Sequence, residues 1–584
     1  MPEYKNDPNR ITFLGLIDYR NKMVKFGIKA KDRTKHTYII GKSGMGKSTL
    51  LENMAIQDIQ NGEGLAFIDP HGGTAEKLLD FIPEERKKDV IYFAPFDTEY
   101  PLGLNVLEKV DEDKRYLVAN GLLASFKKVF GEDKFSDRMQ NILNNIFLAL
   151  LENENETLIG VNRILSDKEY RKKIVSNVKD PSIKAFWTEE FAKAGEKYQQ
   201  EAAPAIQNKI GQFTSNPLIR NIVGQKRTSF DIRDIMDNRK ILIVNLSKGK
   251  VGEGNSNLIG SLLITKIYLA AMSRADVDPY KLNELPPFYF YVDEFQNFAN
   301  DSFADILSEA RKYQLALIVG HQYIDQLTLE VKSAIFGNVG TMITFRVGAT
   351  DAEIFEREFS PVFSADDIVN LSAYQMYLRL MIDNIGSKPF SAKALPPIYK
   401  PELSFTEEIL EHSRHRYGRE KSTVENEIKD WYTPIVHIKE DKEQNINNFQ
   451  DRNNYKHTQK ENRENKIFEK NTYNTYTDKT NNHIRSKRND YKKERDIQNI
   501  ELKEIREEKE KIEKEFKENN TSLKDALAIA LKDQKRRIDL SNKEDKEDKE
   551  ETELKKEIKE EENTKKDKLE EVPEKVLRDL IDEE

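Results

Sequence analysis

Short apolar runs alternate with longer stretches of helical spacing along residues 1–435. The apolar runs predict buried strands, and they occupy residues 37–40, 65–68, 90–93, 241–246, 288–292, 315–319 and 341–345. Apolar strands that alternate with helices are typical of a parallel sheet covered on both faces. Ahead of them, residues 11–30 predict two short strands or a hairpin. The pattern therefore predicts an α/β fold built around a central, mainly parallel sheet.

The hydrophobic spacing changes to a helical period in the middle of this region. Apolar side chains there recur at intervals of three and four, as at Leu122 and Phe126. We therefore predict an all-α subdomain over residues 112–224. It would be inserted between a first part of the core at residues 1–111 and a second part at residues 225–435.

Residues 436–584 differ from the rest in composition. They are rich in Lys, Glu and Asn and poor in aliphatic side chains, and such a chain cannot bury enough apolar area to offset the entropy lost on ordering. We predict a charged, mostly disordered tail. Short amphipathic helices at residues 522–531 and 572–581 are candidates for docking a partner.

Composition excludes several classes of site. The 584 residues include no cysteine, so disulfides, thiolate nucleophiles and cysteine zinc sites are excluded. No uninterrupted run of 18 apolar residues occurs, and the first ten residues are polar, so the sequence predicts no membrane span. We expect a cytoplasmic protein that other proteins recruit if it acts at the inner face of the membrane. The formal net charge of -8 argues only weakly against DNA, because a local basic lining can bind it.

The most informative motif follows the first buried strand. Residues 41–49 read GKSGMGKST, which is the P-loop pattern GxxxxGK[ST] between a strand and a helix-forming segment. Its glycines let backbone N–H groups turn toward phosphate oxygens, and the following helix N-terminus attracts the same anion. We expect Lys47 to reach the outer phosphates of ATP and Ser48 to bind Mg²⁺. The predicted nucleotide-binding residues are Gly41, Lys42, Ser43, Gly44, Met45, Gly46, Lys47, Ser48 and Thr49.

Polar side chains that suit ATP hydrolysis follow two later strands. Asp293 and Glu294 end the apolar run at residues 288–292. Asp293 is the candidate second Mg²⁺ ligand, and Glu294 is the candidate group that orients and polarises the attacking water. Gln322 follows the next strand, where a polar side chain can sense the γ-phosphate. From position alone, Gln322 could also be an ordinary exposed glutamine.

Several other charged residues are candidates for the same chemistry. Arg311, just before the strand that leads to Gln322, could reach a nucleotide on a neighbouring subunit, or it could be a solvated cation at a helix end. Arg346 and Arg357 are weaker cationic candidates. Asp69 and His71 lie at the carboxyl end of a strand, where α/β sheets place ligands, but His71 lacks the companions that a metal site needs.

Taken together, these motifs resemble those of a known group of motors. The blocks GKSGMGKST, FIDPHGG, ILIVNLSKG, FYFYVDEFQNF and EARKYQLALIVGHQ are similar in order and spacing to the HerA/FtsK superfamily of hexameric P-loop ATPases. Within it, the chain most resembles the coupling ATPases of conjugation and type IV secretion (TraG/TraD-like). The resemblance covers residues 11–397.

The resemblance implies a RecA-like core, a homo-hexameric ring, ATP hydrolysis at subunit interfaces and DNA as the translocated partner. By position, Asp293 and Glu294 match the family's Mg²⁺ acid and catalytic glutamate. Gln322 matches its sensor glutamine, and Arg311 matches its trans-acting arginine. The implied partners are a secretion channel or a relaxase.

Two features depart from that family, and two other functions stay open. Coupling proteins usually carry N-terminal transmembrane helices, which this sequence does not predict, and the charged tail lies outside the shared motifs. One alternative is a HerA-like motor for DNA-end processing, which would have a nuclease partner. The other is a docking module for which the nucleotide is only a switch. We expect an ATPase that DNA stimulates.

Overall fold

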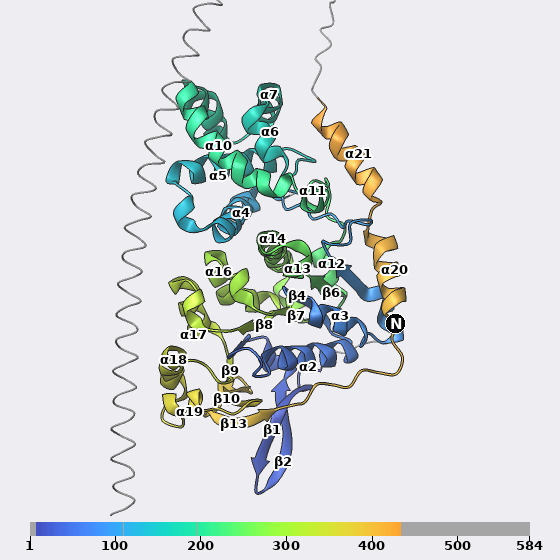
Figure 1. The fold of residues 1–584 in the computed structure, drawn as a ribbon, viewed down its shortest axis with the longest axis vertical. Helices are drawn as coiled ribbons and strands as arrows, with labels where there is room; N and C mark the ends of the chain where they lie inside the picture. The colour runs from blue at the N-terminus through green and yellow to red at the C-terminus, as the bar shows by residue number, and fades with distance from the viewer. Residues whose placement is uncertain (1–6, 109, 194, 434–584) are drawn as a thin grey trace, which may run out of the picture. The chain divides into compact units, whose positions relative to one another are not determined.

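The computed structural model describes residues 7–433 apart from residues 109 and 194. The tail predicted over residues 436–584 lies outside the described residues, as do its two candidate helices. The strands are β1 (Ile11–Tyr19), β2 (Lys22–Lys29), β3 (Thr37–Ile40), β4 (Gly64–Asp69), β5 (Val90–Phe93), β6 (Ile241–Asn245), β7 (Phe288–Val292), β8 (Leu315–His321), β9 (Thr341–Thr344), β10 (Gln375–Arg379), β11 (Met381–Ile382), β12 (Ile385–Gly386) and β13 (Phe390–Ala394). All but β11 and β12 form one 11-stranded sheet in the order β2-β1-β13-β10-β9-β3-β8-β7-β4-β6-β5 (Figure 1).

Helices flank this sheet and fill the interval between β5 and β6. They are α1 (Ala30–Arg33), α2 (Lys47–Gln60), α3 (Gly73–Leu79), α4 (Arg115–Phe130), α5 (Asp137–Leu151), α6 (Gly160–Ser166), α7 (Lys168–Asn177), α8 (Pro181–Ala185), α9 (Phe191–Lys193), α10 (Gly195–Thr214), α11 (Pro217–Val223), α12 (Ile232–Asp237), α13 (Lys248–Val251), α14 (Glu253–Met272), α15 (Pro279–Leu282), α16 (Asp301–Glu309), α17 (Leu329–Asn338), α18 (Ala349–Phe359), α19 (Ala365–Val369), α20 (Thr406–Tyr417) and α21 (Lys421–Tyr432).

The strands from β9 to β5 in the sheet order are mutually parallel. Every apolar run that the sequence predicts as a buried strand lies in this parallel part. The predicted α/β fold with a mainly parallel central sheet is therefore confirmed. Since the carboxyl ends of parallel strands meet at one edge, the loops after β3, β7, β8 and β9 share that edge.

The rest of the sheet is antiparallel. β10 pairs with β9, β13 with β10, and β1 with β13. The hairpin predicted over residues 11–30 is β1–β2, and β2 forms the outer strand of the sheet. The sequence did not predict β10 and β13, which bring residues near 375 and 392 against the strands around the P-loop.

Side chains that alternate along the central strands pack on opposite faces of the sheet. Ile39 and Tyr291 lie in one hydrophobic cluster with residues of α2 and α3. Tyr38 and Phe290 lie in the other, with residues of α4, α14 and α16. This alternation is the period of two that a strand imposes, and here both of its faces are buried.

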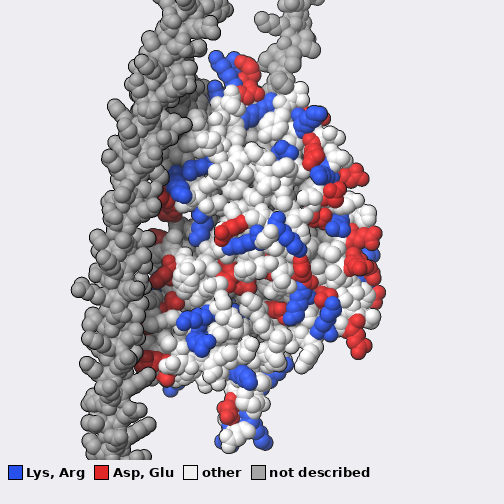
Figure 2. Space-filling view, viewed as in Figure 1, with Lys and Arg blue, Asp and Glu red and all other residues white. Residues whose placement is uncertain are grey.

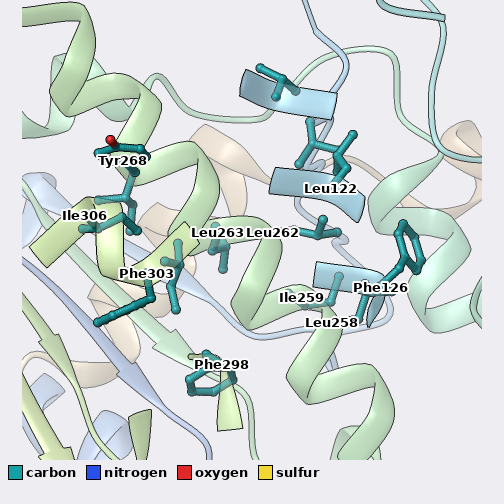
Figure 3. Packing of buried hydrophobic residues seen from close by; sticks show 14 of the residues in the cluster. Leu122, Phe126, Leu258, Ile259, Leu262, Leu263, Tyr268, Phe298, Phe303 and Ile306 are labelled. Atoms are coloured by element: carbon teal, nitrogen blue, oxygen red, sulfur yellow. The ribbon is translucent and has the colours of Figure 1, made fainter. Parts of the chain in front are cut away.

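The helix α14 forms the centre of the larger hydrophobic cluster. Figure 3 shows Leu258 and Leu262 of α14 among side chains from neighbouring helices, including Phe126 of α4 and Phe303 of α16. Within the described part of the chain, one stretch, Glu253–Asp276, is long and apolar enough to cross a membrane, with a mean hydropathy of 1.3. Of the apolar 18-residue window within that stretch, 67% is buried inside the protein, where it packs in the hydrophobic core.

The last two described helices run along the protein from the sheet to the helices between β5 and β6 (Figure 1). On α20, the Ser413 hydroxyl accepts a hydrogen bond from the Tyr92 N–H of β5 at 3.0 Å. On α21, Val424 and Ile428 pack against Ile159, which precedes α6. These helices therefore tie the helical part of the chain to the core.

Candidate active site

The P-loop connects the end of β3 to the start of α2. Gly46 is the residue before α2 and has φ +115°, a backbone conformation that side-chain-bearing residues rarely adopt. The Lys47 side chain is 4% exposed, and its Nζ donates to the Gly41 carbonyl at 2.7 Å. Burial lowers the pKa of Lys47, which the nearby carboxylates of Glu294 and Asp293 partly offset. A buried ammonium group and the N-terminus of α2 thus face the same loop.

Two segments that follow in the sheet hold the P-loop in place. The Lys42 N–H donates to the Arg346 carbonyl at 2.9 Å, and the Tyr374 N–H donates to the Met45 carbonyl at 3.2 Å. Phe345 is fully buried beneath the loop, and a Cβ at Gly41 would lie 2.6 Å from its Cβ. The P-loop motif does not predict these contacts. They are made by residues that follow β9 and by the residue before β10, which lie far from the motif in the sequence.

Asp293 lies at the carboxyl end of β7 and contacts the P-loop helix directly. The Ser48 hydroxyl donates to Asp293 Oδ2 at 2.8 Å, and the Glu294 N–H donates to Oδ1 at 2.9 Å. Asp293 is 2% exposed, and this burial, together with the charges of Glu294 and Asp69, raises its pKa to about 6. Hydroxyl and carboxylate oxygens are ligands that Mg²⁺ prefers, so Ser48 and Asp293 fit a magnesium site.

Glu294 and Gln322 form the next pair. Gln322 follows β8, and its Nε2 donates to Glu294 Oε1 at 2.8 Å. Gln296 donates to the other carboxylate oxygen at 2.6 Å. Glu294 is 6% exposed and has φ +47°, a left-handed conformation that is uncommon for a glutamate and clusters at functional sites. The sequence did not predict Gln296, although it lies two residues beyond the candidate acid.

Arg311 lies at the opposite edge of the sheet from the P-loop of its own chain. It is exposed and belongs to the short 3-10 turn Ala310–Tyr313, which leads into the amino end of β8, whereas Gln322 follows the carboxyl end. A strand of this length spans roughly 20 Å. The fold therefore keeps Arg311 away from Glu294 and Gln322 within one chain.

Of the remaining charged candidates, some lie beside the P-loop or shape a nearby turn, and others are exposed on the surface. Arg346 is half-buried beside the P-loop, where its carbonyl holds Lys42. Arg357 is exposed on α18. Asp69 accepts the N–H groups of His71 and Ala75 at 2.8 and 2.9 Å, so its carboxylate shapes the turn before α3. The side chain of His71 is exposed.

Comparisons with known proteins place this arrangement in a family. A family model described as the type IV secretion-system coupling protein DNA-binding domain matches residues 21–381. Among curated proteins, the DNA repair and recombination protein RadB of Methanococcoides burtonii is 26% identical over 140 residues. That match covers 22% of this chain and 62% of RadB, so the chain spans less than two thirds of this relative.

The solved structures that match this chain include two of a coupling protein and one of VirB4. The conjugative coupling protein TrwBdeltaN70 in its unbound monoclinic form has a TM-score of 0.46 at 14% identity, covering 67% of this chain and 90% of that one. The plasmid coupling protein TrwB in complex with ADPNP has a TM-score of 0.48 at 14% identity, covering 69% and 92%. VirB4 of Thermoanaerobacter pseudethanolicus has a TM-score of 0.45 at 15% identity, covering 67% and 97%.

The matched residues 21–381 include the P-loop, the two acids Asp293 and Glu294, and Gln322. They make up more than half of the 584 residues. The chain therefore belongs to the type IV secretion-system coupling protein DNA-binding domain family.

Proposed function

We propose that this protein is an ATPase of the coupling type that hydrolyses ATP with Mg²⁺ to move DNA. The observation that carries the proposal is the pair of hydrogen bonds that join three separate strands at one sheet edge. Ser48 after β3 contacts Asp293 after β7, and Glu294 contacts Gln322 after β8. Phosphoryl transfer to water requires four groups. They are a P-loop, an acid that binds the metal, a carboxylate that orients the water and a polar side chain that senses the γ-phosphate.

Each of these residues has a definite task in hydrolysis. The P-loop N–H groups and Lys47 bind the phosphates of ATP and stabilise the charge that develops on the γ-phosphate. Glu294 orients and polarises the attacking water. Ser48 and Asp293 would hold Mg²⁺, which would supply positive charge to neutralise the phosphate oxygens. Gln322 donates to Glu294 in this structure, so movement of its amide toward a bound γ-phosphate would release the carboxylate.

Arg311 serves a second copy of the chain in this proposal. Because roughly the length of β8 separates it from Gln322, it does not complete its own site. Its exposed guanidinium is free to enter the site of a neighbour in a ring, where an arginine stabilises transition-state charge. A homo-hexamer with the sites between subunits fits this placement, and a secretion channel or a relaxase would be its further partner.

The chain as a whole is acidic, with a formal net charge of -8. Basic side chains at particular places on the surface would therefore have to make the contacts to DNA. On the face drawn in Figure 2, Lys and Arg side chains are interspersed with Asp and Glu. Contacts to phosphates give an affinity that falls steeply as salt is added. Translocation by such contacts predicts that DNA raises the rate of ATP hydrolysis, and more so at low salt.

The first test is steady-state ATPase activity with and without DNA, with the mass of the assembly measured in ATP. Glu294→Gln should lower kcat by roughly 10²–10⁴-fold, the usual contribution of a positioned base. Arg311→Ala should lower kcat by roughly 10³–10⁵-fold, the usual contribution of a trans-acting arginine, while leaving ATP affinity nearly unchanged. DNA-stimulated hydrolysis by a species of about six subunits is the expected result for the wild-type protein.

Matched controls separate these roles from general damage to the fold. Lys312→Ala removes the neighbouring exposed cation, which pairs weakly with Glu309 at 4.0 Å, and should retain activity. Glu330→Gln removes an exposed carboxylate on α17 and should also retain it. ATP binding without turnover would favour a nucleotide-switched docking module. An ATPase rate that changes neither when DNA is added nor when Arg311 is replaced would contradict the proposal that the protein moves DNA.

A further inference from the structure

Tyr374 lies directly beside the P-loop. It precedes β10, which runs antiparallel to β9, so it reaches the same sheet edge as the carboxyl ends of β3 and β9. Its N–H donates to the Met45 carbonyl at 3.2 Å, and its carbonyl accepts from Ala394 at 2.9 Å. The ring carbon Cδ1 lies 3.3 Å from the position that a Cβ would take at Gly46. The aromatic ring therefore stands against the last glycine of the phosphate-binding loop.

The backbone at Tyr374 is unusual for such a residue. Its φ is +66°, in the left-handed region, where a bulky side chain is a true outlier. The two backbone hydrogen bonds fix this conformation, although the side chain is 53% exposed and gains little burial in return. Strained conformations of this kind persist where the surrounding structure enforces them, and they cluster at ligand clamps.

The polar groups of the site define which end of a nucleotide lies near Tyr374. β3 lies between β8 and β9 in the sheet. Glu294 and Gln322 lie over β7 and β8, so the γ-phosphate must lie on that side of the P-loop. The nucleoside end then leaves the loop on the opposite side, over β9 and β10. Tyr374 presents an aromatic ring there.

We propose that Tyr374 is the stacking platform for the nucleobase of the nucleotide bound at the P-loop. This inference rests on the proposed function, because it assumes a nucleoside triphosphate in that loop. A flat, half-exposed ring offers a π-face to a purine, and stacking of a base on an aromatic side chain contributes to affinity without reading the edge of the base. The phosphates supply the rest of the binding and do not depend on the ring.

The test compares two ligands that share phosphates and differ in the base. The dissociation constants of Mg·ATP and Mg·tripolyphosphate are measured by titration calorimetry on the full chain and on Tyr374→Ala, Tyr374→Gly and Tyr374→Phe. Tyr374→Ala and Tyr374→Gly should weaken ATP binding roughly tenfold and leave tripolyphosphate binding unchanged. Tyr374→Phe should bind both ligands like the wild type. Tyr374→Gly also removes the backbone strain at this position. Unchanged tripolyphosphate binding would show that the phosphate-binding loop of each variant is intact, so poor folding would not explain a loss of ATP affinity alone.

Tyr19→Ala is the matched control, because Tyr19 is a similarly exposed tyrosine, at 56%, at the end of β1. It should bind both ligands normally. Equal losses for ATP and tripolyphosphate in the Tyr374 variants would show that the residue only shapes the loop, and no loss would show that it plays no part; either result overturns the inference and leaves the proposed function standing. A wild-type protein that binds neither ligand would overturn both.

Discussion

Gly320 allows β8 to pass close to Asp293, which follows β7, and to the P-loop helix α2. A Cβ built at this position would lie 2.8 Å from Cδ1 of Leu51 on α2 and 2.9 Å from Oδ1 of Asp293. Both distances are shorter than real Cβ contacts, so an alanine must displace both of these neighbours. Leu51 is fully buried, and Asp293 is held by Ser48.

We therefore predict that Gly320→Ala moves the Asp293 carboxylate and lowers kcat for ATP hydrolysis by roughly 10–100-fold, as small displacements of catalytic groups do. The measurement is steady-state kinetics over a range of Mg²⁺ concentrations, in which the variant should need more Mg²⁺. Gly337→Ala is the control, because a Cβ there meets nothing within 4 Å, and it should retain activity. Equal rates in both variants would show that Asp293 tolerates the methyl group.

At this scale the sequence predicts the residues that belong to a motif and misses those that reach the site through tertiary contacts. Lys47 and Ser48 follow from the P-loop pattern, and Glu294 follows from its place at the end of an apolar strand. Phe345 and Tyr374 contact the P-loop because β9 ends and β10 begins at its edge. Nothing in their local sequence carries that information, because pairing of distant strands decides it.

A buried ion pair joins α1, α2 and β7. Arg33 and Asp58 are both 1% exposed, and the guanidinium donates to both carboxylate oxygens, at 2.5 and 2.8 Å. Arg33 also donates to the Tyr291 hydroxyl at 2.7 Å and lies over the Tyr289 ring at 3.7 Å. The P-loop helix is thereby tied to the strand that carries Asp293.

We predict that Asp58→Asn lowers the free energy of unfolding by about 3–5 kcal/mol, because it leaves the Arg33 charge buried without a counter-charge. Urea unfolding followed by circular dichroism measures this loss. Asp383→Asn is the control: Asp383 pairs with Lys29 and Lys31 but is 51% exposed, so its removal should cost much less. A similar small loss in both variants would mean that water or neighbouring groups compensate for Arg33.

The elements differ in how readily the sequence reveals them. The parallel strands are apolar along their whole length because helices cover both faces, and a short continuous apolar run is easy to recognise. In β10 only Met376 and Leu378 are buried, between half-buried and exposed neighbours. Its partner β13 alternates in the same way. Such short antiparallel strands look like loop sequence until the fold brings them together.

Across the whole described fold, the C-terminal helices connect parts that lie far apart in sequence. The Arg163 guanidinium, on α6, lies 4.7 Å from the centres of both the Tyr170 and the Trp431 rings and donates to the Thr433 carbonyl at 3.3 Å. Asn221 of α11 donates to Glu425 of α21 at 3.2 Å. The helices between β5 and β6 are thus fastened to α21, and through α20 to β5.

The stability of the molecule should depend on pH through two buried histidines. Burial lowers the pKa of His36 to about 4, and the charge of Arg311 lowers it further in the same direction. Burial likewise lowers the pKa of His321 to about 3. Unfolded histidine titrates near pH 6.5, so between that pH and about 4 these two histidines bind protons in the unfolded chain but not in the folded one. Their contribution to stability is therefore fully present above pH 6.5 and is lost as the pH falls toward 4. The raised pKa of Asp293, about 6, acts in the opposite direction below pH 6 and offsets part of this loss.

His36→Asn isolates one of these contributions. His36 has φ +64°, which asparagine tolerates, and its Nδ1 accepts the Leu317 N–H at 3.1 Å, a contact that an amide oxygen can replace. Urea unfolding at several pH values from 4.5 to 7.5 should show a smaller loss of stability with acid in this variant, by about 1.4 kcal/mol per pH unit below 6.5. His415→Asn, at a side chain that is 75% exposed, should follow the wild type. Parallel pH profiles for wild type and His36→Asn would show that His36 takes up its proton in the folded state as readily as in the unfolded chain.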